Sequence, residues 1–237
     1  MPIKIQKGLP AKAILESENI FVMDEERAVA QDIRPLQILI LNLMPIKEDT
    51  ETQILRALSN TPLQVDCSFL MMKSHQSKNT SQSHLNKFYT FFEDIKNDKY
   101  DGMIITGAPV ELLDFEAVDY WSELCSIMDY ARRNVYSTLY LCWGCFAGLY
   151  HHYGIPKYAL EHKMSGIFMN ERTVDGDPLL RGFDDTFPIP QSRHTTLDKH
   201  DIEKCGELTI LAESAESGVT IIKSNDNREV FMTGHLE

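Results

Sequence analysis

The stretch Thr138–Tyr153, TLYLCWGCFAGLYHHY, decides the fold class of this chain. Residues 138–141 predict a buried strand, and the residues from Phe146 onward predict a helix that ends at Gly154. The tripeptide Cys142-Trp143-Gly144 is predicted to form a tight turn between the two. A strand that passes directly into a helix is the repeating unit of an α/β sheet.

The same alternation recurs on both sides of this stretch. Before it, strands are predicted at 38–44, 65–72 and 103–105, and helices at 48–58, 88–95 and 118–132. After it, short strands and turns are expected from residue 167, ending in strands at 219–222 and 230–232. Four strand–helix units in series predict a doubly wound, mostly parallel α/β sheet in a single domain, with the functional residues at the carboxyl ends of the strands. We expect residues 1–32 to form an acidic N-terminal arm and residues 33–237 to form this domain.

Composition excludes several classes of partner. The 237 residues carry a formal net charge of −12, which argues against nucleic acid and anionic membrane as partners. The longest apolar stretch, Leu36–Met44, is far shorter than the roughly 20 residues of a membrane-spanning helix. The first 30 residues lack the apolar segment of a secretory signal, so a cytoplasmic protein with reduced cysteines is expected.

Cys142 stands where the predicted strand passes into the helix, which is the geometry of a nucleophile elbow. The positive end of the helix favours a thiolate there, and the backbone N–H of Trp143 is placed to hold an oxyanion. Two alternatives stay open, a buried structural cysteine and a redox dithiol of Cys142 with Cys145. No metal site is expected, because there is no second Cys-x-x-Cys, and His151-His152 is interpreted as a helix surface.

The last predicted strand leads into Thr233-Gly234-His235-Leu236-Glu237. Residues two apart share one face of an extended segment, so His235 and Glu237 suit the roles of base and orienting carboxylate. Together with Cys142 they form a candidate catalytic triad of nucleophile, proton shuttle and orienting group.

Several motifs in the same order resemble the homoserine O-acyltransferases of methionine biosynthesis. The stretches that carry the resemblance span almost the whole chain: residues 42–45 (NLMP), 106–109 (TGAP), 141–144 (LCWG), 150–155 (YHHYGI), 192–194 (SRH) and 234–237 (GHLE). The resemblance implies a class I glutamine amidotransferase-like, flavodoxin-like fold. It also implies Cys142 as the acylated nucleophile, His235 as base with Glu237 as its partner, and Lys163 and Ser192 as substrate-binding residues.

The function that this resemblance implies is acetyl transfer from acetyl-coenzyme A to the γ-hydroxyl of L-homoserine. Acetyl-coenzyme A would enter as a co-substrate, with no bound cofactor, and a backbone N–H near Ala108 would help Trp143 to hold the oxyanion. Arg193 is a further candidate cation for a substrate carboxylate or phosphate, and Lys47 is a weaker one. Glu111 is expected to favour the acetyl donor, because its charge repels the distal carboxylate of a succinyl group.

Other interpretations are a homoserine O-succinyltransferase, a Cys-His-Glu glutamine amidotransferase or hydrolase and, more remotely, a redox protein. Members of the resembling family continue past the His-x-Glu motif and carry there an arginine for the homoserine carboxylate. The chain ends at Glu237 and is therefore expected to be truncated. A homodimer is left open.

Overall fold

A computed structural model describes residues 3–23, 28, 34–75, 77 and 79–236. The strands are β1 (Ile3–Lys4), β2 (Val22–Met23), β3 (Leu36–Leu41), β4 (Val65–Leu70), β5 (Tyr89–Thr90), β6 (Tyr100–Ile105), β7 (Val135–Leu141), β8 (Tyr158–Arg172), β9 (Thr186–Thr196), β10 (Leu208–Ser214), β11 (Gly218–Ser224) and β12 (Glu229–Met232). The α-helices are α1 (Ala11–Ser17), α3 (Lys47–Leu58), α4 (Gln82–Phe88), α5 (Phe92–Ile95), α6 (Trp121–Asn134), α7 (Trp143–Tyr153) and α8 (Lys199–Cys205).

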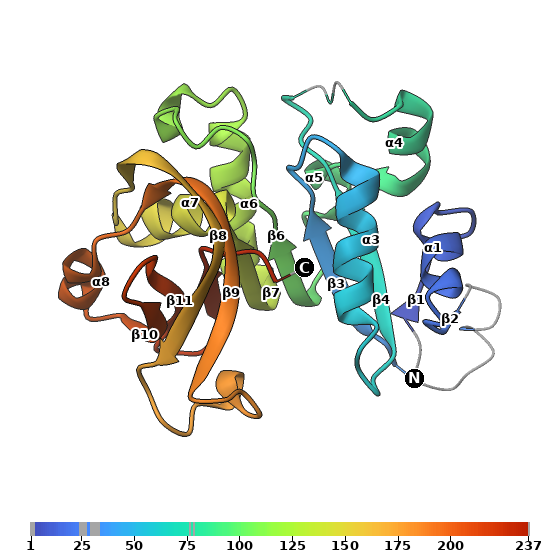
Figure 1. Cartoon of the computed structure of the whole chain (residues 1–237). Helices are drawn as coiled ribbons and strands as arrows, with labels where there is room; N and C mark the ends of the chain where they lie inside the picture. Colours follow the sequence, from blue (N-terminus) through green and yellow to red (C-terminus); the bar gives the residue numbers. More distant parts are fainter. Residues whose placement is uncertain (1–2, 24–27, 29–33, 76, 78, 237) are drawn as a thin grey trace.

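The strands of the described residues form one sheet in the order β2-β1-β4-β3-β6-β7-β12-β11-β10-β8-β9, with β5 paired to β4 beside this path (Figure 1). The pairs from β2 to β12 are parallel, and those from β12 to β9 are antiparallel. The chain therefore adopts the predicted α/β fold, with a mostly parallel half and an antiparallel half. Cys142 follows β7, near the middle of the sheet.

Helices cover both faces of the parallel half, as the continuous apolar strands require. In β3, Leu39 and Leu41 face one core cluster, which α6 and α7 complete. Ile40, between them, faces a second cluster, to which α1 and α3 contribute. Alternate side chains of one strand thus anchor the two helical layers to opposite faces.

Residues 3–23 belong to the segment expected as an N-terminal arm, but they extend the sheet rather than stand apart from it. β1 pairs in parallel with β4, and Ile3 and Leu15 are fully buried in the core cluster around α1 and α3. The boundary predicted at residue 33 does not separate two bodies in the described residues.

Three further local predictions differ from the structure. The helix expected over 88–95 is interrupted by β5, whose two residues extend the sheet beside β4. The long β8–β9 ribbon stands where only short strands were expected, whereas the strands predicted at 219–222 and 230–232 are present as β11 and β12. Helix α8 was not predicted; Asp198 caps it by accepting a hydrogen bond from the N–H of His200. Among the helices of the described part, none has both the length and the apolar character of a membrane span.

Candidate active site

Cys142 connects β7 to α7 in a strained backbone conformation. Its φ is 50° and its ψ is −119°, and it is one of three non-glycine residues with positive φ among the described residues. Such a conformation costs about 1–3 kcal/mol and persists where the surrounding structure imposes it. The predicted nucleophile elbow is therefore present. The N–H of Trp143, the first helical residue, has no acceptor within the helix and is available to an oxyanion.

β12 carries His235 to the same edge of the sheet. Met232 lies opposite Leu141 in the parallel pair of β12 with β7, and its carbonyl oxygen accepts the N–H of Cys142 at 2.8 Å. The N–H of His235 then donates to the carbonyl oxygen of Pro190 on β9 at 3.0 Å. This close approach requires a glycine at 234, because a Cβ there would lie 2.3 Å from Ile189. Glu237, the third predicted triad member, lies outside the described residues.

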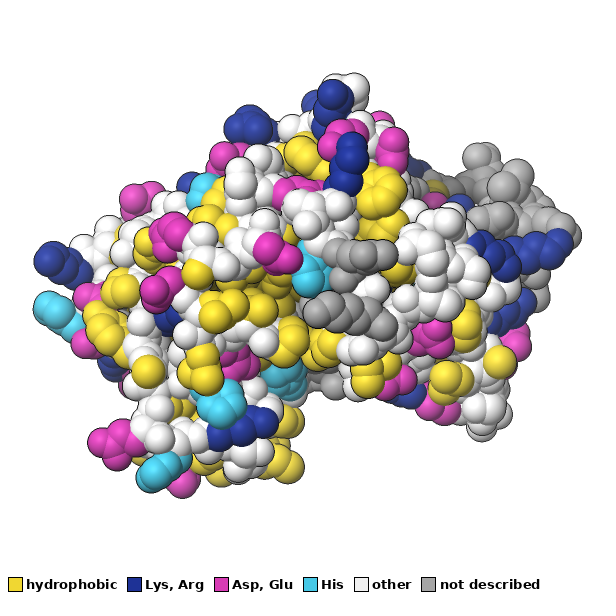
Figure 2. Space-filling model, turned by 90° about the horizontal axis from the view of Figure 1, so that it is seen from above, with side chains coloured by type: hydrophobic (Ala, Val, Ile, Leu, Met, Phe, Trp, Pro, Cys, Tyr) yellow, Lys and Arg dark blue, Asp and Glu magenta, His cyan; other side chains and the backbone are white. Residues whose placement is uncertain are grey.

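A cavity of about 840 Å³ opens above Cys142 at the carboxyl ends of the parallel strands. Its walls include Cys142, His235, Lys163, Ser192 and Glu111. Ala108 also lines it, on the loop after β6, where a second oxyanion donor is expected. Figure 2 looks onto this end of the molecule, where histidine and hydrophobic side chains gather around a hollow. Residues far apart in the sequence thus meet in one site.

Two contacts hold Glu111 in the cavity wall. Its carboxylate oxygen Oε2 accepts the backbone N–H of His194 at 2.7 Å. The Nζ of Lys157 donates to the carbonyl oxygens of Glu111 at 2.6 Å and Leu113 at 2.5 Å. This Nζ lies 4.4 Å from the centre of the Phe115 ring, and burial lowers the pKa of Lys157. Lys157 was not among the predicted site residues, because nothing in the chain marks a lysine 46 residues away as the anchor of this loop.

Lys163 and Ser192 reach the cavity from the β8–β9 ribbon. The pairing passes from Ala159–Thr195 directly to Met164–Arg193, so residues 160–163 bulge out opposite His194. A bulge re-aims side chains, and this one turns Lys163 toward the cavity. Ser192 projects from the exposed face of β9. His194 also lines the cavity, a position that was not predicted from the sequence.

Comparisons with known proteins identify the family of this chain. The sequence model of the homoserine O-succinyltransferase family matches residues 2–237. The chain belongs to this family. Two relatives named homoserine O-acetyltransferase, from Geobacillus sp. (strain WCH70) and Methanomethylophilus alvi (strain Mx1201), are 60% and 59% identical over 237 residues. The alignments cover 100% of this chain and 78% and 77% of those relatives.

Solved structures of glutamine amidotransferase type share the fold. A glutamine amidotransferase from Thermotoga maritima matches with a TM-score of 0.59 and 13% identity, over 86% of this chain and 76% of that one. The glutaminase domain of CTPS from Trypanosoma brucei matches with a TM-score of 0.57 and 10% identity, over 84% of this chain and 85% of that one. The predicted class I glutamine amidotransferase-like fold is confirmed.

The structure does not place Arg193 at the cavity of this family member. Ser192 and Arg193 project to opposite faces of β9, and the guanidinium of Arg193 is fully buried. Its Nε donates to Gln191 at 3.0 Å, and its terminal nitrogens donate to the carbonyl oxygens of Thr195 and Ser217. Arg193 therefore supports β9, and its guanidinium does not reach a substrate in the cavity.

Lys47 lies on a neighbouring cavity of about 510 Å³, which shares the walls Met44, Pro45, Pro109 and Val110 with the cavity of Cys142. Its Nζ donates to the carbonyl oxygen of Asn42 at 2.5 Å. Burial lowers its pKa to about 8, although the nearby Glu51 opposes this shift. Lys47 thus stands beside the candidate site rather than in it.

The second cysteine of the Cys-x-x-Cys motif does not line the cavity. Cys145 is fully buried, and burial raises the pKa of its thiol well above the ordinary value. Both Cys142 and Cys145 are free thiols in the structure. Of the two, only Cys142 lines the cavity, and no disulfide joins them.

Proposed function

We propose that this protein transfers an acetyl group from acetyl-coenzyme A to the γ-hydroxyl of L-homoserine through an acyl-enzyme on Cys142. The observation that carries the proposal is a strained cysteine at a strand–helix elbow, open to a cavity that His235, Lys163 and Ser192 share. Family membership and relatives named homoserine O-acetyltransferase support the same activity.

In the first half-reaction, His235 takes the proton of the Cys142 thiol and the thiolate attacks the thioester carbonyl. The N–H groups of Trp143 and Ala108 hold the resulting oxyanion. The carbon–sulfur bond to coenzyme A breaks as the carbonyl re-forms, and His235 gives its proton to the departing thiolate. Glu237 completes the proposed triad by orienting the imidazole. Each oxyanion donor contributes about 3 kcal/mol to the stability of the transition state.

In the second half-reaction, His235 removes the proton of the homoserine γ-hydroxyl as that oxygen attacks the acetyl-enzyme. The ester forms, and the Cys142 thiolate leaves. Lys163, which lines the cavity and carries a positive charge, is assigned to the homoserine carboxylate, and Ser192 to a hydrogen bond with the same substrate. Use of a coenzyme A thioester fits the cytoplasmic location expected from the sequence.

Glu111 supports acetyl rather than succinyl as the transferred group. Its carboxylate is held in the cavity wall by the N–H of His194, so it cannot swing away from a longer acyl group without losing that bond. Two carboxylates about 4 Å apart repel by about 4 kcal/mol at an effective dielectric constant near 20. A succinyl group would bring the second carboxylate.

Steady-state assays of the purified chain test the proposal. Release of free coenzyme A is measured with homoserine and either acetyl- or succinyl-coenzyme A, and ammonia release is measured with glutamine. Homoserine-dependent turnover of acetyl-coenzyme A, abolished in Cys142→Ala, is the expected result. Ammonia release from glutamine, or faster use of succinyl-coenzyme A, would contradict it.

A further inference from the structure

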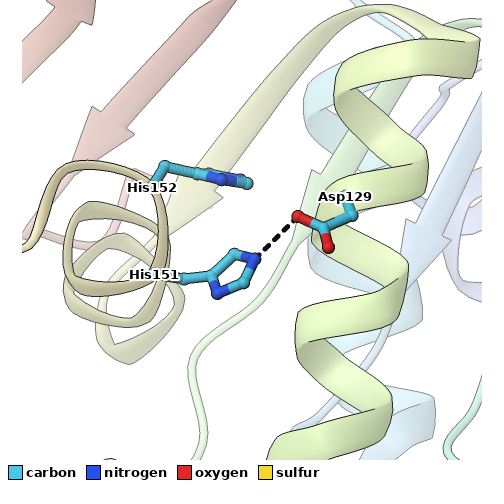
Figure 3. A group of neighbouring side chains, drawn as sticks. All are labelled: Asp129, His151 and His152. Carbon is cyan, nitrogen blue, oxygen red and sulfur yellow. Dashed lines mark hydrogen bonds and ion pairs between the residues drawn. The ribbon is translucent and has the colours of Figure 1, made fainter.

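Three side chains with metal-ligating atoms meet between α6 and the end of α7. Asp129 comes from α6, and His151 and His152 come from the last turn of α7 (Figure 3). One ligand atom from each lies within 4.8 Å of the other two. Among the described residues, no other set of three or more such side chains meets this criterion. The sequence shows no ligand spacing here, because Asp129 precedes the two histidines by a whole strand.

The surroundings of the two histidines favour a bound cation. Both residues lie in the last turn of α7, where the helix dipole places negative potential. The Nε2 of His152 lies 3.4 Å from Oε1 of Glu229 and 3.2 Å from the hydroxyl of Tyr140. A histidine that donates one ring N–H to a carboxylate has its other nitrogen free for a metal, an arrangement common around zinc.

Negative charges outnumber positive ones around Asp129, His151 and His152, which favours a divalent cation. Asp129 and Glu229 supply two carboxylates, while Arg132 is the nearby cation and is bound to Glu229 at 2.6 Å. Two imidazoles and a carboxylate are a common ligand set for zinc.

We propose that Asp129, His151 and His152 bind a divalent transition-metal ion of the zinc type, with water completing the coordination. Tetrahedral ligands at about 2.0–2.1 Å from zinc stand about 3.3 Å apart. The present ion pair of His151 Nε2 with Asp129 Oδ1 is 2.8 Å long and would open slightly around the metal. The Asp129 side chain is 49% exposed, which leaves it room to make this movement.

A metal ion here would tie α6 to the end of the helix that carries the nucleophile. α7 spans 11 residues, so this site lies roughly 15 Å from Cys142 along the helix axis. The ion would thus act on the position of α7 and not on the reacting atoms. Metal binding at this place does not depend on the acyl-transfer chemistry.

Cobalt(II) titration of the full chain tests the site, in a Cys142→Ser background that removes the catalytic thiol as a competing ligand. Visible absorption and calorimetry report binding, and zinc is then added to displace the cobalt. Asp129→Asn and His151→Ala alter side chains that are 49% and 21% exposed, and far-UV circular dichroism verifies that both variants fold. His200→Ala, at an exposed histidine of α8, is the matched control.

The expected result is one cobalt ion per chain, with weak visible bands and no intense thiolate charge-transfer band. Asp129→Asn and His151→Ala are each expected to weaken binding at least about tenfold, since even the loss of a residue that only orients a ligand costs about 10- to 100-fold. His200→Ala should bind as the background does. Absence of binding, equal binding in all variants or an intense thiolate band would overturn the proposal.

Discussion

At the scale of single residues, Cys142 and Cys145 lie three positions apart but have different surroundings. Cys142 has the positive φ of the elbow and lines the cavity, whereas the side chain of Cys145 is buried in the core on which α7 packs. The N–H of Cys145 donates to the carbonyl oxygen of Cys142 at 2.9 Å, as the first turn of the helix requires. The backbone role of position 145 is therefore independent of its thiol.

Replacement of Cys145 by alanine is expected to leave most of the activity. The thiol of Cys145 is buried and its pKa is raised far above neutrality, so it offers no nucleophile, and alanine preserves the helix. Loss of the buried sulfur is expected to cost about 1 kcal/mol of stability. The measurement is kcat/KM for acetyl transfer beside that of Cys142→Ala. Equal inactivation of both variants would favour the dithiol mechanism.

Glu111→Gly is expected to shift the choice of acyl donor. The variant removes the charge and the side-chain volume that Glu111 places in the cavity wall, so succinyl-coenzyme A should gain and acetyl-coenzyme A should lose efficiency. A difference of about 1.4 kcal/mol corresponds to a tenfold change in the ratio of the two kcat/KM values. An unchanged ratio would show that Glu111 does not determine donor choice.

At the scale of elements, α7 fits against β6 with almost no space to spare. A Cβ at Gly144 would lie 2.7 Å from the carbonyl oxygen of Thr106 and 2.8 Å from that of Ile105. Both are backbone atoms and cannot move aside as the end of a side chain would. The first turn of α7 is therefore fixed against the end of β6, and with it Cys142.

Gly144→Ala is expected to lower the free energy of unfolding by about 1–3 kcal/mol, as overpacked core substitutions do. It should also slow the formation of the acyl-enzyme, because α7 must shift and Cys142 shifts with it. Urea denaturation and rapid-quench acylation measure the two effects. Cys145→Ala, in the same helical turn, is the control. If Gly144→Ala were as stable as the wild type, α7 could move away from the carbonyl oxygens of Ile105 and Thr106 at little cost, which would contradict this account.

The end of α7 predicts an acid-sensitive step in stability. Burial lowers the pKa of His152 from 6.5 to about 4, so the unfolded chain takes up this proton at a higher pH than the folded chain does. Stability should therefore fall as the pH falls from 6.5 to 4, by at most about 3 kcal/mol for this group. Above pH 6.5 the contribution of His152 should stay constant.

Thermal and urea unfolding at several pH values compare the wild type with His152→Gln, and His200→Gln is the control. The stability difference between the wild type and His152→Gln should shrink between pH 6.5 and 4, whereas His200→Gln should follow the wild type. Parallel curves for the wild type and His152→Gln over this range would contradict the assignment.

At the scale of the whole molecule, strictly local patterns predicted the parallel half of the sheet. β7, the elbow at Cys142 and α7 were expected because strand, turn and helix signals lie side by side in the chain. The β8–β9 ribbon was not expected, because β8 is mostly exposed and β9 is buried on one face only. Neither strand has the continuous apolar run of a strand buried on both faces, and their register comes from cross-strand pairing. Tyr89 and Thr90 were assigned to a helix for a related reason, since pairing with β4 outweighs local propensity there.

Some residues of the candidate site could likewise be predicted from local sequence patterns, and others could not. Cys142 and His235 could be placed at the carboxyl ends of strands from the sequence, and the structure puts both on one cavity. The burial of Arg193 could not be foreseen, because only the alternation of β9 decides that Ser192 faces out and Arg193 faces in. Lys157 and the metal-binding group at Asp129 depend on contacts between distant elements.

Intact mass spectrometry after incubation with acetyl-coenzyme A, in the absence of homoserine, tests the acyl-enzyme on Cys142 most directly. We predict one added acetyl group per chain, located on the peptide that contains Cys142, removed by homoserine and absent from Cys142→Ala. Product formation by the wild type without such an intermediate, or an acetyl group on another residue that homoserine removes, would contradict acyl transfer through Cys142.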